Sequence, residues 1–360
     1  MNLRTLLLVS IQLLWIPHAF ADEVQLAGQI FTQYGSRNQG DVLSNEFAIT
    51  RAELGTYVKV SDYWHGEIRL EGFRSATPQS LIGLDLNSFA VRVNRAWGGV
   101  QMKLSDDVTG QINFGLVIDP WIVTAERSFG LRGLQPTIYE RSRLFDTADL
   151  GVSLRLDCYD ELFRLHASLT NGEGRRQVEQ NASKNLTVVA STTPLKMSLN
   201  EQKLSVRLAL IYRLGSVGVA NVESSRYGGQ VSVEHPMISI GGALLRAQGV
   251  NFRGDQVADI LTVWGHGRVI KNWIHTYVVF DQWRADISLE DSALREISAG
   301  LYTNLGYDGT QVLRLFAGTR ILRYESNASP LAGATEAFNS VGGEVKLELT
   351  VSNMWSMNEQ

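Results

Sequence analysis

Apolar and polar residues alternate along most of the chain. From residue 47 the sequence reads FAITRAELGTYVKV, in which Leu54 and Val58 share one parity while Arg51 and Glu53 occupy the other. Successive side chains of a β-strand point to opposite faces, so this spacing predicts a strand with one apolar and one polar face. No comparable stretch sustains the period of a helix. The pattern therefore predicts an all-β fold.

Sixteen segments follow this alternation. They cover approximately residues 24–34, 46–60, 64–74, 88–104, 108–118, 148–157, 161–170, 184–193, 203–214, 225–235, 237–248, 256–267, 274–283, 294–304, 311–324 and 338–351. The fourth segment changes parity between Val93 and Val100, and the pair Gly98-Gly99 between them predicts a β-bulge. An even number of strands is compatible with a closed antiparallel barrel.

The connections between these segments alternate between long and short. The long ones cover residues 35–45, 75–87, 119–147, 171–183, 215–224, 249–255, 284–293 and 325–337. The short ones include residues 61–63, 105–107, 158–160, 236 and 307–309. Outer-membrane barrels have long extracellular loops and short periplasmic turns. The rhythm predicts a transmembrane antiparallel β-barrel of about 16 strands with that orientation.

A soluble sandwich or propeller is the alternative, because it would also alternate strands and turns. Aromatic residues near the predicted strand ends favour the membrane, where they form interfacial girdles. The girdle candidates are Tyr34, Tyr57, Tyr63, Trp64, Trp97, Tyr212, Trp264, Trp273, Trp283, Tyr302 and Tyr324.

The N-terminal segment has the features of an export signal. Residues 1–21 combine an early Arg4, an apolar stretch and the small-residue pattern Ala19-Phe20-Ala21. This order predicts a cleaved signal peptide, with an uncleaved interfacial helix as the alternative, and leaves residues 22–360 as the barrel. The full chain has 33 basic and 37 acidic residues and one Cys, which argues against a nucleic-acid binder and excludes a disulfide framework.

Short motifs in the first half resemble those of a known family. Residues 47–55 (FAITRAELG) and 61–64 (SDYW) resemble the second strand and first periplasmic turn of the phosphate-selective porin O and P family. Residues 139–142 (YERS), followed by 149–152 (DLGV), resemble the family's Glu-Arg-Ser segment and the strand that leaves the third loop. Residues 170–174 (TNGEG) resemble its next loop. The order of these motifs carries the resemblance.

The resemblance extends over residues 46–190 and implies a sixteen-stranded, trimeric channel whose third loop folds into the lumen. The sequence agrees that connection 119–147 is the longest, and a loop of this length is usually functional. Its aromatic residues favour packing inside the barrel, although it shows no helix or strand pattern of its own. We expect a constriction loop, with an ordinary extracellular loop as the alternative.

Charged residues facing water set the selectivity of such pores. The candidates in the loop are Arg127, Arg132, Arg141, Arg143, Glu126 and Glu140. The candidates on the inward parity of the strands are Arg51, Arg69, Arg92, Arg155, Arg164, Arg207, Arg314 and Arg320. The alternative for each arginine is a structural ion pair across strands. If Arg141 lines the constriction, Arg141→Glu is expected to shift ion preference toward cations.

Nothing in the sequence predicts an enzyme. The five histidines after residue 21 show no nucleophile and carboxylate pattern, and the glycine-rich stretches precede no helix. We expect no cofactor or metal, and as partners outer-membrane lipid, small solutes or ions and two further copies in a homotrimer, but no nucleic acid. The predicted function is passive diffusion of small hydrophilic solutes or ions, with possible preference for anions. A plugged barrel acting as an envelope scaffold or adhesin and a soluble secreted β-protein are the alternatives.

Overall fold

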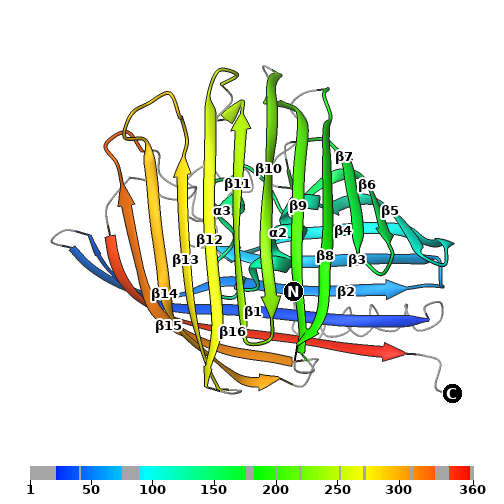
Figure 1. Ribbon diagram of the computed structural model, residues 1–360, viewed down its shortest axis with the longest axis horizontal. Helices are drawn as coiled ribbons and strands as arrows, with labels where there is room; N and C mark the ends of the chain where they lie inside the picture. The colour runs from blue at the N-terminus through cyan, green and yellow to red at the C-terminus, as the bar shows by residue number, and fades with distance from the viewer. Residues whose placement is uncertain are drawn as a thin grey trace, which may run out of the picture.

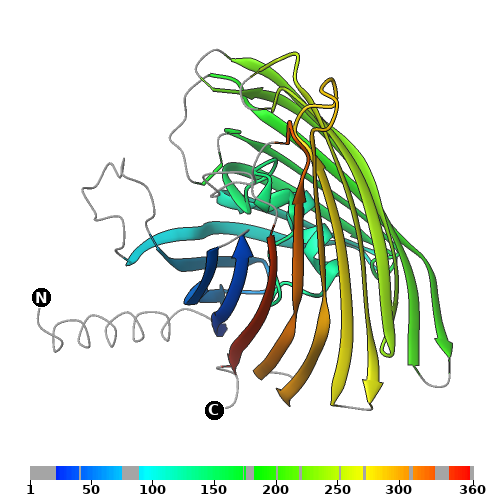
Figure 2. The same cartoon turned by 90° about the vertical axis from the view of Figure 1, so that its left-hand side faces the viewer.

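One antiparallel sheet of sixteen strands closes on itself as a barrel (Figures 1 and 2). The computed structural model describes residues 22–39, 42–74, 89–172, 174–175, 182–199, 202–218, 221–250, 253–270, 273–307, 311–328 and 340–356. The first strand pairs with the last, and each strand also pairs with the strands that come directly before and after it in the sequence. This single closed sheet confirms the sixteen-strand barrel and contradicts the sandwich and the propeller. The predicted signal peptide lies outside the described residues.

The strands match the predicted segments closely. Their bounds are β1 Glu23–Gln39, β2 Val42–Lys59, β3 Trp64–Arg74, β4 Phe89–Ser105, β5 Val108–Ile118, β6 Ala148–Cys158, β7 Phe163–Thr170, β8 Asn185–Leu199, β9 Gln202–Val217, β10 Val222–His235, β11 Ile238–Gln248, β12 Val257–Ile270, β13 Ile274–Arg284, β14 Ala293–Tyr307, β15 Gln311–Tyr324 and β16 Ser340–Ser356. Residues 119–147, here called the inner loop, connect β5 to β6 and contain helices α2 (Pro120–Phe129) and α3 (Ile138–Arg141).

The predicted bulge at Gly98-Gly99 is wrong. The two glycines pair regularly with β3, and the register instead shifts between Arg95 and Val93, which leaves Asn94 as the extra residue. A Cβ at Gly99 would lie 2.5 Å from the carbonyl oxygen of Ile112 in β5. Close approach of the neighbouring strand therefore accounts for this glycine. The bulge turns both Asn94 and Arg95 toward the lumen.

The outward-facing side chains of the barrel are largely apolar and exposed. Leu54, Val91 and Leu210 leave 62%, 71% and 67% of their surface uncovered. In a barrel, a continuous exposed apolar face is the surface that meets lipid. No described helix has the length and apolar character needed to cross a membrane.

The aromatic girdle is only partly confirmed. Tyr63, Trp64 and Trp273 are exposed at strand ends, as expected. The prediction is wrong for Trp264 and Trp283, which are 2% and 4% exposed on the inner face of the wall. Tyr57, Trp97, Tyr302 and Tyr324 also lie on inward-facing register positions. Trp264, Trp283, Tyr302 and Tyr324 face inward on the side of the barrel that packs against the inner loop, whereas Tyr57 and Trp97 lie beside His65 on the other side.

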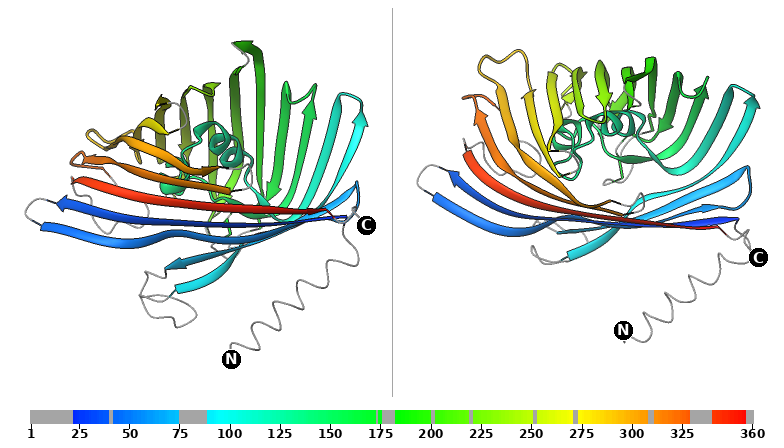
Figure 3. Two further views of the ribbon diagram at one scale, coloured as in Figure 1. Left: turned by 90° about the horizontal axis from the view of Figure 1, so that it is seen from below. Right: turned by 60° about the horizontal axis from the view of Figure 1, so that its bottom comes forward.

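The two sides of the lumen differ in polarity. The inward residues of β2 to β7 are mostly polar or charged, whereas those of β8 to β15 include a continuous set of buried apolar side chains. Figure 3 shows α2 and α3 inside the ring of strands, next to the green and yellow part of the wall. The inner loop therefore has an apolar wall on one side and a charged wall on the other.

Candidate functional site

Helix α2 begins and ends where local sequence signals place it. Asp119 is the N-cap, and its carboxylate accepts hydrogen bonds from the backbone N–H groups of Trp121 and Ile122 at 2.8 and 3.1 Å. Pro120 at the first helical position has the required φ and no N–H to leave unpaired. Gly130 ends the helix with a left-handed φ of 67°. The expectation that the loop has no helix is therefore wrong.

One face of α2 packs against the apolar wall. Trp121, Ile122, Ala125 and Phe129 are all at most 5% exposed and fall on one side of the helix. Phe129 contacts Trp264 of β12 edge to face, with ring centroids 5.9 Å apart. Burying this stripe removes several large side chains from water, at roughly 1.5 to 3 kcal/mol each. Hydrophobic burial thus holds the inner loop within the lumen.

Polar contacts fix the inner loop to the same wall along its length. They are Arg213 with Asp119 at 3.3 Å, the Trp264 indole N–H with the Ser128 carbonyl at 3.2 Å, the Arg226 Nε–H with the Leu144 carbonyl at 2.9 Å, and the Lys346 ammonium with the Leu134 carbonyl. Because these contacts come from four different strands, they restrain both the position and the tilt of the loop.

Arg141 anchors the loop to two buried carboxylates of the wall. Its guanidinium pairs with Asp281 of β13 and with Glu296 of β14, the latter at 2.6 Å. The two carboxylates are 3% and 1% exposed, and Arg320 of β15 pairs with Glu296 at 2.8 Å. The structure therefore places Arg141 and Arg320 in a buried network between loop and wall. Arg314 pairs with Glu348 at 3.5 Å in the neighbouring strands.

Asp119 offers a test of how strongly the helix cap positions the loop. Asp119→Ala removes two capping hydrogen bonds and leaves buried Arg213 without its carboxylate. We expect the free energy of unfolding in lipid vesicles to fall by about 2 kcal/mol or more, measured by urea titration. Thr137→Ala is the matched control, because Thr137 caps α3 without a side-chain hydrogen bond. Equal losses for the two variants would contradict the role of the Asp119 cap.

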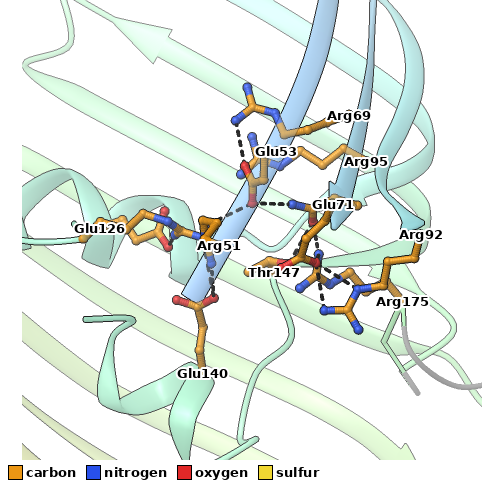
Figure 4. Close-up of polar contacts among 12 residues, drawn as sticks. Arg51, Glu53, Arg69, Glu71, Arg92, Arg95, Glu126, Glu140, Thr147 and Arg175 are labelled. Carbon is orange, nitrogen blue, oxygen red and sulfur yellow. Dashed lines mark hydrogen bonds and ion pairs between the residues drawn. The ribbon is translucent and has the colours of Figure 1, made fainter. Parts of the chain in front are cut away.

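The opposite wall carries a ladder of alternating arginines and carboxylates (Figure 4). Glu53 of β2 and Glu71 of β3 face each other in register, an arrangement that like charges make unfavourable without compensation. Arg51 and Arg69 pair with Glu53 at 3.1 and 3.3 Å. The remaining rungs are Arg69 with Glu67 at 2.9 Å, Arg95 with Glu67 at 3.6 Å, Arg92 with Glu71 at 2.8 Å and Arg175 with Glu71 at 2.8 Å.

The inner loop reaches this ladder across the lumen. The Glu140 carboxylate of α3 lies 3.8 Å from the Arg51 guanidinium and 3.6 Å from that of Arg132, which also contacts Glu126. At the end of the loop, Asp146 pairs with Arg175 at 2.9 Å. The loop is thus fixed to the apolar wall and joined by ion pairs to the charged wall. The inner loop therefore bridges the lumen from one wall to the other.

A cavity of about 620 Å³ opens between α2 and the inner faces of β4 to β9, toward the short-turn ends of these strands. Its charged lining consists of Arg127, Arg132, Arg155, Arg164, Arg207, Glu126 and Glu161. Five arginines against two glutamates give the lining a net charge of +3. Among the five arginines of the cavity lining, Arg127 and Arg155 have the most exposed side chains, at 43% and 37%. An anion in this cavity would meet more positive than negative charge.

Carboxylates in and around the cavity pair with these arginines. Glu161 lies in the turn between β6 and β7 and pairs with Arg127 at 2.5 Å and Arg164 at 2.7 Å. Burial raises the pKa of the Glu161 carboxyl, but the hydrogen bond from Arg127 and the charge of Arg164 outweigh burial and lower the pKa below its usual value. Glu161 therefore stays charged at neutral pH.

The other partners of the cavity arginines are also acidic. Arg155 pairs with Asp157 at 3.0 Å, Arg164 pairs with the same carboxylate, and Arg207 pairs with Glu234 at 2.8 Å. Each lining arginine thus has at least one acidic partner. The lining itself has excess positive charge, but the carboxylates around the cavity reduce this excess when they are counted with it.

The structure divides the sequence candidates into three groups. The ladder contains Arg51, Arg69 and Arg92; the cavity contains Arg127, Arg132, Glu126, Arg155, Arg164 and Arg207; and the third group contains Arg141 and Arg320 in the network at Glu296 and Arg314 in a pair with Glu348 within the wall. Glu140 joins the loop to the ladder. Arg143 is exposed with a φ of 57° and forms no ion pair among the residues that the structure describes.

Sequence reasoning missed several residues of this site. Arg95 faces the lumen only because the bulge lies at Asn94. Arg175 is 1% exposed, and both of its carboxylate partners are remote in sequence. Asp281 and Glu296 could have been noticed, because each is an acid on the inward parity of a strand that is otherwise rich in apolar residues. In the described part of the chain, no group of His, Cys, Asp and Glu could hold a metal ion.

Solved structures with this architecture are outer-membrane proteins. The anion-selective porin from Comamonas acidovorans aligns with a TM-score of 0.63 and 12% identity, over 92% of this chain and 99% of that chain. OmpF from Salmonella typhi, solved with daunomycin, aligns with a TM-score of 0.59 and 11% identity, over 93% and 99%. The chain has the fold of an outer-membrane porin.

OprB from Pseudomonas putida extends this likeness, with a TM-score of 0.59 and 9% identity over 91% of this chain and 94% of that chain. No protein-family model matches the sequence, and no curated protein matches it either. Together with the exposed apolar exterior, the porin fold places the barrel in the outer membrane of a bacterium.

Proposed function

We propose that this protein is a passive diffusion channel for small hydrophilic solutes, with a modest preference for anions. The observation that carries the proposal is the combination of an anchored inner loop with the adjoining cavity, whose lining has a net charge of +3. Charged groups that face water at a narrow point of a pore bias which ions enter. The preference is modest because the carboxylates paired with these arginines reduce the field that a passing ion meets.

We do not extend the proposal to phosphate specificity. The motifs of residues 46–190 resemble the phosphate-selective porin O and P family, and that resemblance agrees with anion preference. A phosphate site would need guanidinium forks free to bind oxygen atoms in pairs. The guanidinium groups of the cavity instead pair with carboxylates, as for Arg155 with Asp157 and Arg207 with Glu234. Phosphate would therefore pass as one small anion among others.

Current through single channels tests the proposal. Purified, refolded protein in a planar bilayer under a potassium chloride gradient is expected to give stepwise conductance and a reversal potential of the sign for chloride preference. Cation preference would overturn the anion assignment and leave a general channel. Verified insertion without current would favour the plugged scaffold.

The oligomeric state is a separate proposal. The family resemblance implies a homotrimer, and the exposed apolar exterior of the barrel would allow copies to associate within the membrane. Light scattering of the protein in detergent, corrected for bound detergent, is expected to give three times the mass of the chain. A mass of one chain would contradict the trimer.

A further inference from the structure

The outer face of the barrel carries a cluster of charges separate from the lumen. Along β11 to β15 the outward-facing charged residues are Arg246, Asp259, Arg284, Arg295 and Arg323. Elsewhere in the described strands, Glu223 of β10 also faces outward. We call Arg246, Arg284, Arg295 and Arg323 the exterior arginines. They face away from the lumen, so a solute in the pore does not meet them.

Register brings the exterior arginines together on four of the five neighbouring strands β11 to β15, with Asp259 on the fifth. Arg246 and Arg284 lie on either side of Asp259, and Arg323 lies opposite Arg295. Adjacent strands are about 4.8 Å apart, so the cluster extends roughly 19 Å across the wall. The cluster is therefore wide enough to contact a lipid headgroup that carries more than one charged group.

The cluster has more positive charge than its own carboxylates neutralise. Arg284 donates to Asp259 at 2.8 Å, and Arg246 lies 3.9 Å from the same carboxylate. Arg295 pairs with Glu325 at 2.7 Å. Arg323 is exposed and has no acidic partner among the described residues. Four arginines against two carboxylates leave a net charge of +2.

The guanidinium groups remain accessible from outside. The side chains of Arg246, Arg284 and Arg295 are 47%, 41% and 52% exposed even though each has a carboxylate nearby. Arginine offers five N–H donors in a fixed fork, so a side chain that already pairs with one carboxylate keeps single N–H groups that can donate to a phosphate oxygen, although it no longer binds two oxygen atoms as an unpaired fork does. The cluster also includes Arg323, whose fork meets no carboxylate among the described residues, and the cavity has no such arginine.

An apolar surface adjoins the cluster. The next outward row toward the short turns contains Val263, Phe280, Ile297 and Ile321, of which Val263 and Ile297 are both 44% exposed. The exterior arginines lie near the long-loop ends of their strands, which is the extracellular side of an outer-membrane barrel. Positive charge thus meets the apolar belt at the level of the outer-leaflet headgroups.

We propose that the exterior arginines bind the phosphate groups of an outer-leaflet glycolipid, whose acyl chains lie along the adjoining apolar row. The net positive charge matches a phosphorylated headgroup, and the apolar row matches its chains. A soluble phosphate or an acidic protein would use the charge but leave the apolar row without a function. The proposal depends on the membrane location of the barrel and not on conduction, so it can hold or fail independently of the channel.

Lipid binding by the intact barrel tests this assignment. Native mass spectrometry of the detergent-purified protein with diphosphorylated lipid A is expected to show a bound lipid that resists exchange. Arg295→Gln combined with Arg323→Gln brings the net charge of the cluster to zero and should weaken binding roughly thirtyfold. Lipid A stripped of its phosphates should bind the unmodified protein as weakly.

Lys103→Gln is the matched control, because it removes an exposed cation at the short-turn end of β4, far from the cluster, and leaves the cluster intact. This variant should bind diphosphorylated lipid A like the unmodified protein, and all variants should keep the electrophoretic mobility of the folded barrel. Binding that persists in the double variant, or that does not change when the lipid phosphates are removed, would overturn the proposal. Equal weakening by Lys103→Gln would also overturn it, since the effect would then follow total charge.

Discussion

Replacing both Arg127 and Arg155 with glutamate should reverse the ion preference of the channel. These two arginines have the most exposed side chains of the cavity lining, and they come from opposite sides, one from α2 and one from β6. Each reversal changes the charge by two, so the lining passes from +3 to −1. The added carboxylates also lie close to Glu161 and Asp157, each of which loses one of its two arginine partners, keeps Arg164 and contributes further negative potential.

The reversal potential under a potassium chloride gradient measures this effect. It should change sign from chloride preference to potassium preference, while the unitary conductance changes less because the inner loop keeps its anchors. The effect should weaken as salt concentration rises, since mobile ions screen charges beyond about 10 Å at 0.1 M.

A control with the same change in total charge separates local from global electrostatics. Arg246→Glu combined with Arg323→Glu adds equal negative charge on the outer face of the wall. This variant should keep the ion preference of the unmodified protein. If both double variants shifted the reversal potential equally, the cavity would not be the selective region.

The strands of this protein could be predicted from sequence because alternation is a local property. Each strand has an outward face that must be apolar, and in β2 to β7 the other face is polar, so the period of two is clear. The predicted ranges 64–74 and 108–118 agree with β3 and β5 residue for residue. The alternation of long and short loops also predicted that the strands close into a barrel, a property that no single strand shows.

Alternation could not show what covers the inner face of the second half. In β13, Val278 and Val279 are neighbours of identical chemistry, yet Val278 is 50% exposed on the outside and Val279 is 1% exposed beneath the inner loop. The girdle prediction failed for Trp264 and Trp283 for this reason. An apolar residue that meets lipid and one that meets a loop within the lumen have the same sequence pattern.

The site was predicted in part for a related reason. The inward parity identified the arginines of the walls, but their partners depend on contacts between residues remote in sequence, such as Arg141 with Asp281 and Arg175 with Glu71. Helix α2 was within reach of sequence analysis, because Asp119-Pro120 and Gly130 are ordinary start and stop signals. A short helix with only one apolar stripe was obscured by the surrounding loop residues.

The burial of Arg141 changes what its substitution should do. If the Arg141 side chain were exposed to the pore, Arg141→Glu would change the ion preference. The side chain is instead only 11% exposed and lies between Asp281 and Glu296. A glutamate there would place three carboxylates together and displace the loop. Arg141→Met is the better test, because it removes the charge while retaining an apolar side chain of similar length.

Arg141→Met should release the inner loop from the wall. Arg320 still neutralises Glu296. Among the described residues, however, Asp281 keeps only neutral hydrogen-bond donors, Gln135 at 3.4 Å and the Thr262 hydroxyl. Removing one partner of a buried ion pair costs about 3 to 5 kcal/mol. We expect larger and noisier unitary conductance, with the free energy of unfolding in lipid vesicles lowered by a similar amount. Arg143→Met, two residues along the same loop, should change neither quantity, since Arg143 is exposed.

A second substitution distinguishes loss of the ion pair from loss of packing. In Arg141→Met combined with Asp281→Leu, no unpaired carboxylate remains beneath the loop, and apolar replacement of a buried pair is often neutral. Quiet, narrow conductance should therefore return, even though the double variant lacks both charges. If the double variant were as noisy as Arg141→Met, the ion pair itself would be required to seat the loop. If neither variant differed from the unmodified protein, the apolar stripe of α2 would suffice to hold the constriction.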